Sequence, residues 1–359
     1  MNPAEMLEAA VEPREWITLA DRVARLGTNA GHKLPSKFAT LNDATRGGPR
    51  TGKVAIVGGA PGAGKTTWVT QLGVDYAVKG THVAILACDE DADGLLVRIG
   101  QHFRLDRDAI EDGRAHDDLT KLAKSSLGKL LLIDADEDHA SVEEASQELA
   151  RRANGAPSVL IVDSLQTAQA AGTEEADGPR ARVDAVMTAL KRAAKIDQHL
   201  VIATCELSRG SYRSKKVSEQ IDDLAAFKES GGIEYGASLA LVLRSVRGGG
   251  DLVDVAMPKN RLGQRLAWRM EFDRGRASFA EVATPPAAVE DVDPVTEAKQ
   301  RVRRVLAAAS APILSKGELK RRATGRGEIV GKAIEEMLDE GDMLHDKAAG
   351  YTLASEEST

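Results

Sequence analysis

The chain has 359 residues, 42% of them hydrophobic and 29% charged, with a formal net charge of −7. No uninterrupted apolar stretch approaches the roughly 18 residues that indicate a membrane-spanning helix, and residues 1–15 lack the basic and apolar regions of a secretory signal. The acidic balance excludes binding to nucleic acid through overall charge, so any such binding must be local. The two cysteines, Cys88 and Cys205, are expected to be free thiols of a reducing compartment, and we predict a cytoplasmic protein with no membrane partner.

Apolar runs rich in β-branched residues alternate with helical patterns over most of the chain. Such alternation predicts an α/β fold, in which a mainly parallel central sheet carries helices on both faces. The last four strands have no helices between them and are expected to extend the sheet as a meander. In chain order, the predicted segments are strand 54–57, helix 68–78, strand 83–87, helix 93–103, strand 130–133, helix 142–153, strand 159–162, helix 182–196 and strands 200–204, 237–244, 252–258, 266–272 and 277–283.

A stretch rich in proline and acidic residues, 284–294, has no periodicity and is typical of a linker. The pattern after it predicts three helices and a hairpin, which together indicate a small C-terminal winged helix-turn-helix. The predicted organisation is an N-terminal helical arm at 1–33, an α/β domain at 34–283, a linker at 284–294 and a winged helix at 295–359.

The segment Gly59–Thr66 reads G-x-x-x-x-G-K-T, follows the first predicted strand and precedes the first predicted helix. This context is typical of a P-loop, in which backbone N–H groups surround the phosphates of a nucleoside triphosphate. We expect Lys65 to reach the β- and γ-phosphates and Thr66 to ligate Mg²⁺. The predicted nucleotide-binding residues are Gly59, Ala60, Pro61, Gly62, Ala63, Gly64, Lys65, Thr66 and Thr67.

Asp163 ends the apolar, β-branched run Ser158–Asp163, which has the pattern of a buried parallel strand. At the carboxyl end of such a strand, Asp163 would lie beside the P-loop and hold Mg²⁺ through water. An aspartate in this place is also often the cap of the next helix. Together with Lys65 and Thr66 the metal role is favoured, so ATP and Mg²⁺ are the predicted cofactors.

Several motifs follow one another in a specific order across residues 34–282. They are 34–48 before the P-loop, 87–93 with Arg98, 163–166, 204–209, 228–234 and 259–263. In this order they resemble the RecA-like motor of DnaB-type hexameric replicative helicases and of the related plasmid RepA helicases. The resemblance implies a RecA-like P-loop NTPase fold that hydrolyses ATP.

Hydrolysis also needs a group that orients and deprotonates the attacking water. The resemblance places that role in 87–93, where an ungapped count back from Arg98 selects Asp89 and side-chain length favours Glu90. We choose Glu90 and keep Asp89 as the alternative, and an acidic helix cap is the other interpretation. Glu206 stands where the family has its sensor glutamine, and its charge would repel a γ-phosphate unless it is paired, for instance with Arg209.

Lys259 and Arg261 lie in a segment that resembles the family's lysine-x-arginine-x-glycine finger. They follow a strand at the far end of the predicted sheet, too distant to reach their own P-loop. The resemblance implies that they act in the neighbouring subunit's site, so the chain is expected to form a homo-oligomer, a hexameric ring with shared active sites. Two solvated cations in a turn are the alternative interpretation.

The loop after strand 200–204 has four cations and an aromatic residue within eight positions. In a ring such a loop would line the central hole, where cations contact phosphates and an aromatic ring stacks on a base. The winged helix carries both basic and acidic residues, so DNA and a protein remain equal candidates for its ligand. The predicted DNA-binding residues are Arg209, Tyr212, Arg213, Lys215 and Lys216.

These features predict an ATP-dependent DNA helicase that translocates on single-stranded DNA during replication of a plasmid, phage or mobile element. A replication initiator or loader protein is a further predicted partner. Two other classes stay open: a filament-forming recombination ATPase of the RecA/Sak type, and an ATP switch that loads or regulates a partner. The predicted catalytic residues are Lys65, Glu90, Asp89, Asp163, Glu206, Lys259 and Arg261.

Overall fold

The chain divides into two compact units, residues 1–283 and residues 284–359. The computed structural model describes residues 18–24, 31–174, 178–207, 227, 236–246 and 248–282 of the first unit. In the second unit it describes residues 294–307, 309, 313, 315–323, 327–346 and 350–353.

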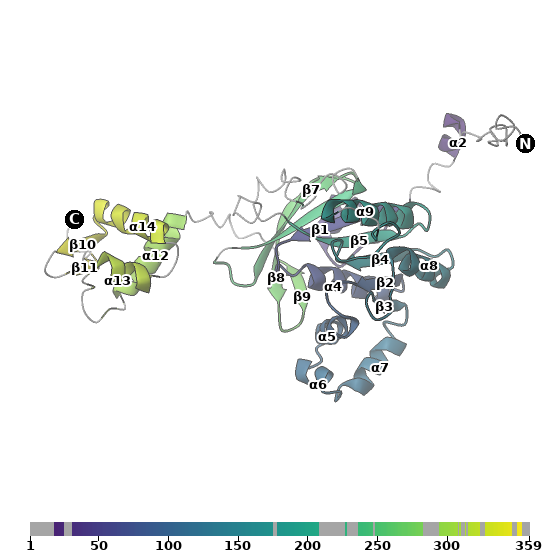
Figure 1. Ribbon diagram of the computed structural model, residues 1–359, viewed down its shortest axis with the longest axis horizontal. Helices are drawn as coiled ribbons and strands as arrows, with labels where there is room; N and C mark the ends of the chain where they lie inside the picture. The colour runs from purple at the N-terminus through teal and green to yellow at the C-terminus, as the bar shows by residue number, and fades with distance from the viewer. Residues whose placement is uncertain are drawn as a thin grey trace, which may run out of the picture. The chain divides into compact units, whose positions relative to one another are not determined.

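The first unit is built on a nine-stranded sheet of order β3-β2-β4-β5-β1-β6-β7-β8-β9 (Figure 1). The six strands from β3 to β6 are parallel, and β7, β8 and β9 are added to β6 in antiparallel pairs. The predicted mainly parallel sheet with a terminal meander is therefore confirmed. The strands are β1 Lys53–Gly59, β2 His82–Ala87, β3 Leu130–Asp134, β4 Ser158–Asp163, β5 Leu200–Glu206, β6 Leu239–Ser245, β7 Leu252–Asn260, β8 Ala267–Asp273 and β9 Ser278–Glu281.

Helices cover both faces of the sheet, because the central strands are apolar on both sides. One core cluster includes Trp68 and Leu72 of α4, and the other includes Leu149 of α8 and Leu190 of α9. Three short helices, α3, α6 and α7, were not predicted; each has fewer than ten residues, which is too short for a repeated apolar stripe. The helices are α2 Leu19–Ala24, α3 Ala39–Ala44, α4 Lys65–Val78, α5 Ala92–His102, α6 Arg107–Glu111, α7 His116–Lys124, α8 Val142–Ala153 and α9 Pro179–Lys195.

The second unit has its own core, to which Val302, Leu319, Ile334 and Met343 contribute. The third helix packs on the first, and an isolated bridge pairs Ile313 with the second strand of the hairpin. This order of elements is the one on which the winged-helix prediction rests, and that assignment stays a prediction. The elements are α12 Pro294–Ala307, α13 Lys316–Arg322, α14 Gly327–Asp339, β10 Met343–Asp346 and β11 Gly350–Leu353.

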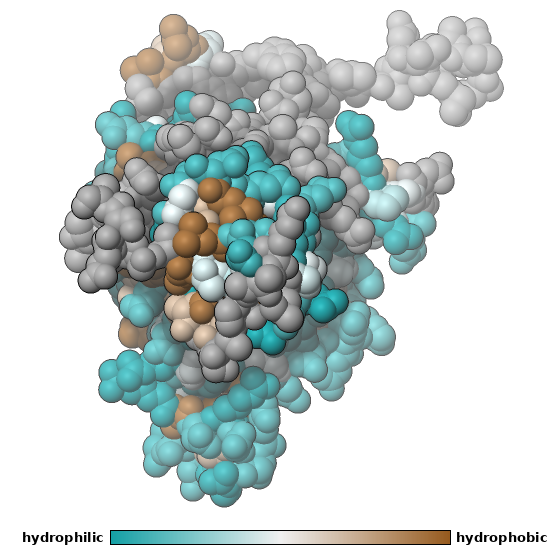
Figure 2. All heavy atoms as spheres, turned by 90° about the vertical axis from the view of Figure 1, so that its left-hand side faces the viewer, coloured by the Kyte–Doolittle hydropathy of each residue, from teal (hydrophilic) through white to brown (hydrophobic). Residues whose placement is uncertain are grey.

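The described atoms on the face shown in Figure 2 are mostly hydrophilic and surround a small apolar area.

Among the helices that the structure describes, none combines the length and the apolar character needed to cross a bilayer. Neither Cys88 nor Cys205 forms a disulfide; Cys205 is buried and Cys88 is partly buried. Burial and the neighbouring Asp163 raise the pKa of Cys88 to about 12, so this thiol is protonated at neutral pH.

We expect Asp254→Ala to lower the free energy of unfolding by about 3–5 kcal/mol. Asp254 of β7 and Arg269 of β8 form a buried pair with a shortest N–O distance of 2.6 Å, and the substitution removes both hydrogen bonds that the carboxylate accepts from the guanidinium. Urea unfolding followed by circular dichroism measures the change. Asp118→Ala, which removes an exposed partner of Lys121, is the matched control and should alter the value by no more than about 0.5 kcal/mol. Equal effects of the two substitutions would contradict the prediction.

Candidate functional site

The turn between β1 and α4 depends on two glycines. Gly62 and Gly64 have φ angles of 76° and 88°, in the left-handed region that favours glycine. A Cβ atom on Gly64 would also lie 2.6 Å from Cζ of Phe279. The tight turn leaves backbone N–H groups at the amino end of α4, where the helix favours an anion.

Lys65 begins α4 and folds back over this turn. Its Nζ donates to the carbonyl oxygens of Gly59, at 3.1 Å, and Ala60, at 3.4 Å. The ammonium group is therefore held where the turn would surround phosphate oxygens, and bound phosphates would compete for the same three protons. All of the predicted nucleotide-binding residues, 59–67, lie in this turn and in the flanking ends of β1 and α4.

Asp163 lies at the carboxyl end of β4 and is buried. The Thr204 hydroxyl of β5 donates to its Oδ1, and the Thr66 hydroxyl lies close enough to lower its pKa. Burial has the larger effect and raises the pKa of Asp163 above its ordinary value of 3.8. The alternative role, a cap of the next helix, is not the one found, because the side chain bonds to the neighbouring strand.

The residues around Asp163 fit a magnesium ion. Its Oδ2 is buried and has no hydrogen-bond partner in the part of the chain that the structure describes. A buried carboxylate oxygen without a donor costs free energy, which a metal-bound water would offset. One hydroxyl, from Thr66, and one carboxylate are a donor set that suits Mg²⁺, since this ion keeps several waters and takes its other ligands from phosphates.

The end of β2 brings Asp89 beside this carboxylate. Ala87 is level with Asp163 in the sheet, and the Asp89 N–H donates to the Asp163 carbonyl oxygen at 3.0 Å. The side chain of Asp89 is exposed, and its charge contributes to the raised pKa of Asp163. Asp89 therefore presents a carboxylate at the same edge of the sheet as the P-loop.

Glu90 has a different environment. Its two carboxylate oxygens accept from Arg98, at 2.8 Å from Nε and 3.0 Å from Nη2. Arg98 also donates from Nη1 to the Thr67 hydroxyl at 3.3 Å, which links Glu90 to the first turn of α4. Neither Glu90 nor Asp89 is the helix cap that the sequence allowed, because Asp91 accepts from the Gly94 N–H at 2.7 Å.

Glu206 ends β5 next to the start of the P-loop. It is level with Gly59 in the sheet, and its N–H donates to Oε1 of Gln166 at 3.3 Å. The predicted sensor position is thus adjacent to the phosphate-binding turn. The proposed partner Arg209 and the predicted DNA-binding residues Arg209, Tyr212, Arg213, Lys215 and Lys216 lie outside the described residues.

Lys259 and Arg261 lie at the opposite end of the sheet, where the parallel strand β1 begins. Lys259 is level with Ala240, and the Arg261 N–H donates to the carbonyl oxygen of Ser238, whose own N–H bonds to Val54. Val54 precedes Gly59 by five residues of β1, so the end of the sheet with Arg261 and the end with the P-loop are about 16 Å apart along the strands. The exposed Arg261 side chain therefore lies at the end of the sheet opposite its own P-loop.

Two features of this site have no signature in the sequence. Thr204 was part of a motif but had no predicted role, and it proves to be the donor to Asp163. The β8–β9 hairpin places Phe279 against the P-loop. Phe272 stacks on Phe279, and the Arg274 guanidinium lies 4.7 Å from the centroid of the Phe272 ring. The contacts of Thr204 with Asp163 and of Phe279 with the P-loop join segments distant in sequence, which no local pattern specifies.

Residues 33–281 match the family described as DnaB-like helicase C terminal domain. The chain belongs to this family. It is also 22% identical over 282 residues to a DnaB-like replicative helicase of Enterobacteria phage T4. This match covers 74% of the chain and 58% of the phage protein, so the chain spans little more than half the length of that relative.

Solved structures show the same fold. One of them, described as an ATPase domain, has a TM-score of 0.59 at 18% identity, over 74% of this chain and 97% of that one. A DnaB-like replicative helicase, described with its interactions with primase, has a TM-score of 0.59 at 18% identity, over 78% and 70%. A KaiC-like protein of Pyrococcus horikoshii has a TM-score of 0.51 at 18% identity, over 70% and 99%. The predicted RecA-like ATPase fold is confirmed.

We expect Asp163→Asn to raise the melting temperature of the nucleotide-free protein at pH 7. The pKa of Asp163 is higher in the folded chain than in the unfolded chain, so proton binding favours folding and the ionised carboxylate lowers the free energy of unfolding at neutral pH. The neutral amide removes that cost. Calorimetry should show a difference that shrinks as the pH falls through the Asp163 pKa. A lower melting temperature for the variant at pH 7 would contradict the prediction.

Proposed function

We propose that this DnaB-like chain is an ATP-driven helicase motor that moves along single-stranded DNA during replication. One observation carries the proposal: Lys65 and Asp163 gather at one edge of the sheet, and Arg261 is exposed at the other. A head-to-tail contact between copies would place the Arg261 of one subunit at the P-loop of the next. Contacts of this kind give a ring when the rotation between copies closes and a filament when it does not, and we propose a closed hexamer.

Each residue at the phosphate edge has a separate task in phosphoryl transfer. Lys65 neutralises charge on the β- and γ-phosphates, and the N–H groups of the turn orient them. Thr66 and Asp163 would hold Mg²⁺, which, when bound, supplies charge neutralisation for the phosphate oxygens. Arg261 of the neighbouring subunit neutralises the negative charge that develops as the bond between the β- and γ-phosphates breaks, and Lys259 adds a second positive charge.

The geometry bears on which carboxylate activates water. Side-chain length favours Glu90, but both of its carboxylate oxygens are already engaged by the Arg98 guanidinium. Asp89 lies beside Asp163 and has no such pair among the described residues. We therefore propose Asp89 as the general base, with Glu90 and Arg98 positioning Thr67 at the start of α4.

The path from nucleotide to DNA would start at Glu206. Its strand ends level with Gly59, and the chain then continues into the segment with Arg209, Arg213, Lys215 and Lys216. A change at the γ-phosphate would reach this segment through one strand. The short connection supports our proposal that these cations contact the DNA backbone.

The charges of the C-terminal unit favour a protein ligand over a DNA groove. Lys316 is 2.7 Å from Glu335, and Lys332 is 3.8 Å from Glu336, so acids of α14 neutralise the cations beside them. A helix that enters the major groove needs uncompensated positive charge. We propose an initiator or loader protein as the partner of this unit.

One assay tests the whole proposal: ATP hydrolysis with and without single-stranded DNA, together with strand displacement on a forked duplex. A motor gives DNA-stimulated hydrolysis and displacement. Filaments on DNA without displacement would indicate the recombination class, and nucleotide-dependent partner binding without sustained hydrolysis would indicate a switch.

Asp89→Asn should reduce ATP turnover by about 10²–10⁴-fold and leave ATP binding intact, because the water loses its base while the phosphate contacts remain. Glu90→Gln should cause a smaller loss, since it affects only the position of Arg98 and Thr67. Single-turnover hydrolysis and equilibrium binding of a fluorescent ATP analogue measure the two properties. A larger loss for Glu90→Gln would return the role of base to Glu90.

Arg261→Ala should reduce turnover by about 10³-fold without weakening ATP binding, because the arginine acts only on the charge of the transition state. Mixing this variant with Lys65→Ala subunits should restore part of the activity, at interfaces where an intact P-loop meets an intact Arg261. Steady-state hydrolysis across mixing ratios measures the restoration. If no ratio restores activity and sedimentation shows monomers, the shared-site ring is wrong.

A further inference from the structure

The loop that carries Arg261 is held closed by one side-chain amide. The Nδ2 of Asn260 donates to the carbonyl oxygens of Ala44, at 2.8 Å, and Gln264, at 2.5 Å. Its Oδ1 accepts from the N–H groups of Leu262, at 2.8 Å, and Gly263, at 3.1 Å. Both amide protons and both lone pairs of Asn260 are therefore used, and every one of these bonds ends on the backbone.

The loop has little room to move against its support. The Ala44 carbonyl oxygen accepts a second bond from the Gln264 N–H at 3.1 Å. A Cβ atom on Gly263 would lie 2.1 Å from that same oxygen, so the contact requires glycine. The backbone of Arg261 is fixed as well, since its N–H donates to Ser238 at 2.9 Å. The exposed side chain of Arg261 extends from this fixed base.

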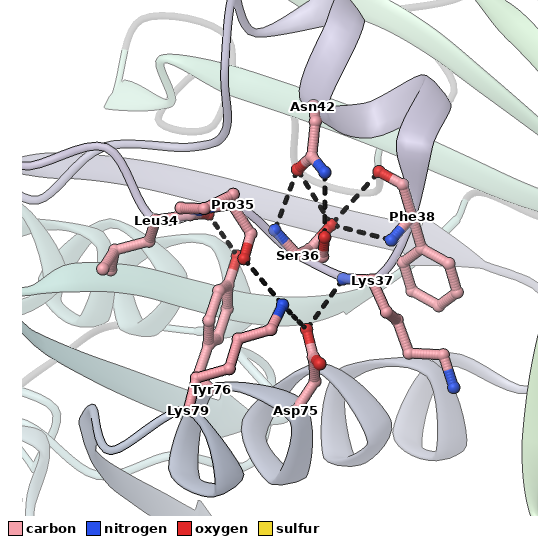
Figure 3. A network of polar contacts seen from close by, with 9 residues as sticks. All are labelled: Leu34, Pro35, Ser36, Lys37, Phe38, Asn42, Asp75, Tyr76 and Lys79. Carbon is pink, nitrogen blue, oxygen red and sulfur yellow. Dashed lines mark hydrogen bonds and ion pairs between the residues drawn. The ribbon is translucent and has the colours of Figure 1, made fainter.

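Ala44 is itself part of a fixed segment. It is the last residue of α3, and the residues just before α3 are bonded to the second half of α4 (Figure 3). Asp75 accepts from the Lys37 N–H at 2.7 Å, and the Tyr76 hydroxyl donates to Leu34 at 3.1 Å. The support of the loop is thus joined to the helix whose first residue is Lys65.

We propose that Asn260 is a positioning residue for hydrolysis in the neighbouring subunit. It holds the loop on Ala44 so that Arg261 leaves the sheet edge in one direction, toward the next P-loop. Asn260 does not touch the nucleotide; it acts through Arg261. The inference rests on the proposed shared-site ring and adds a residue to it.

Asn260→Asp is the sharpest test, because it keeps the side-chain volume and the Oδ1 acceptor and removes both Nδ2 donors. Turnover should fall by about 10²-fold, the effect of a displacement of about 1 Å in a catalytic group, with ATP binding unchanged. Gly263→Ala, which pushes the loop off Ala44 without changing charge, should have the same effect. Asn154→Asp makes the same chemical change at the exposed end of α8 and should keep full turnover.

Mixed oligomers separate positioning from a general loss of structure. Lys65→Ala subunits should restore turnover to Asn260→Asp subunits, since they supply an intact loop to an intact P-loop. Arg261→Ala subunits should restore nothing, because both loops are then defective. Full turnover of Asn260→Asp, restoration by Arg261→Ala, or restoration by neither would overturn the role of Asn260. Failure of the Arg261→Ala and Lys65→Ala mixture is a different result and would reject the ring itself.

Discussion

The register of the parallel strands is the constraint on which the site depends. Gly59 is level with Glu206, and Ala87 is level with Asp163, so the carboxyl ends of β1, β5, β2 and β4 meet at one edge of the sheet. Open parallel sheets bind ligands at this edge. A shift of one residue would turn each side chain to the other face and remove Asp163 from Thr204. The apolar strands that hold the register are therefore as much a part of the site as its polar residues.

The antiparallel extension gives the subunit its second edge. β6 lies parallel to β1, but β7 runs back along it and ends at Asn260, so the chain returns to the edge where β1 begins. This reversal separates Arg261 from Lys65 within one subunit. In the proposed ring, a copy beside the subunit brings the Arg261 of one sheet to the P-loop of the next, so assembly and catalysis are linked.

How much could be predicted from the sequence follows from the range of each interaction. The P-loop is a local pattern, so its residues and the flanking strand and helix were identified from 59–67 alone. The position of Asp163 at the end of a buried strand followed from its apolar run, whereas its proposed metal role was favoured only together with Lys65 and Thr66. The pairing of Glu90 with Arg98, the donor Thr204 and the loop support at Ala44 depend on contacts between distant segments, which composition and spacing do not specify. The short helices α3, α6 and α7 were missed because each has fewer than three turns.

The site combines groups that reduce stability with a scaffold that restores it. Asp163 is buried with a raised pKa, and its Oδ2 has no hydrogen-bond partner among the described residues; neither feature would be favoured for folding alone. The compensation lies elsewhere, in the apolar clusters on both faces of the sheet and in the bonds of Asp75 and Tyr76 to the segment before α3. Because that segment also supports the Arg261 loop, the same bonds that stabilise α4 behind the P-loop fix the backbone that carries Arg261. The stability of the subunit and the geometry of the proposed shared site therefore depend on one set of contacts.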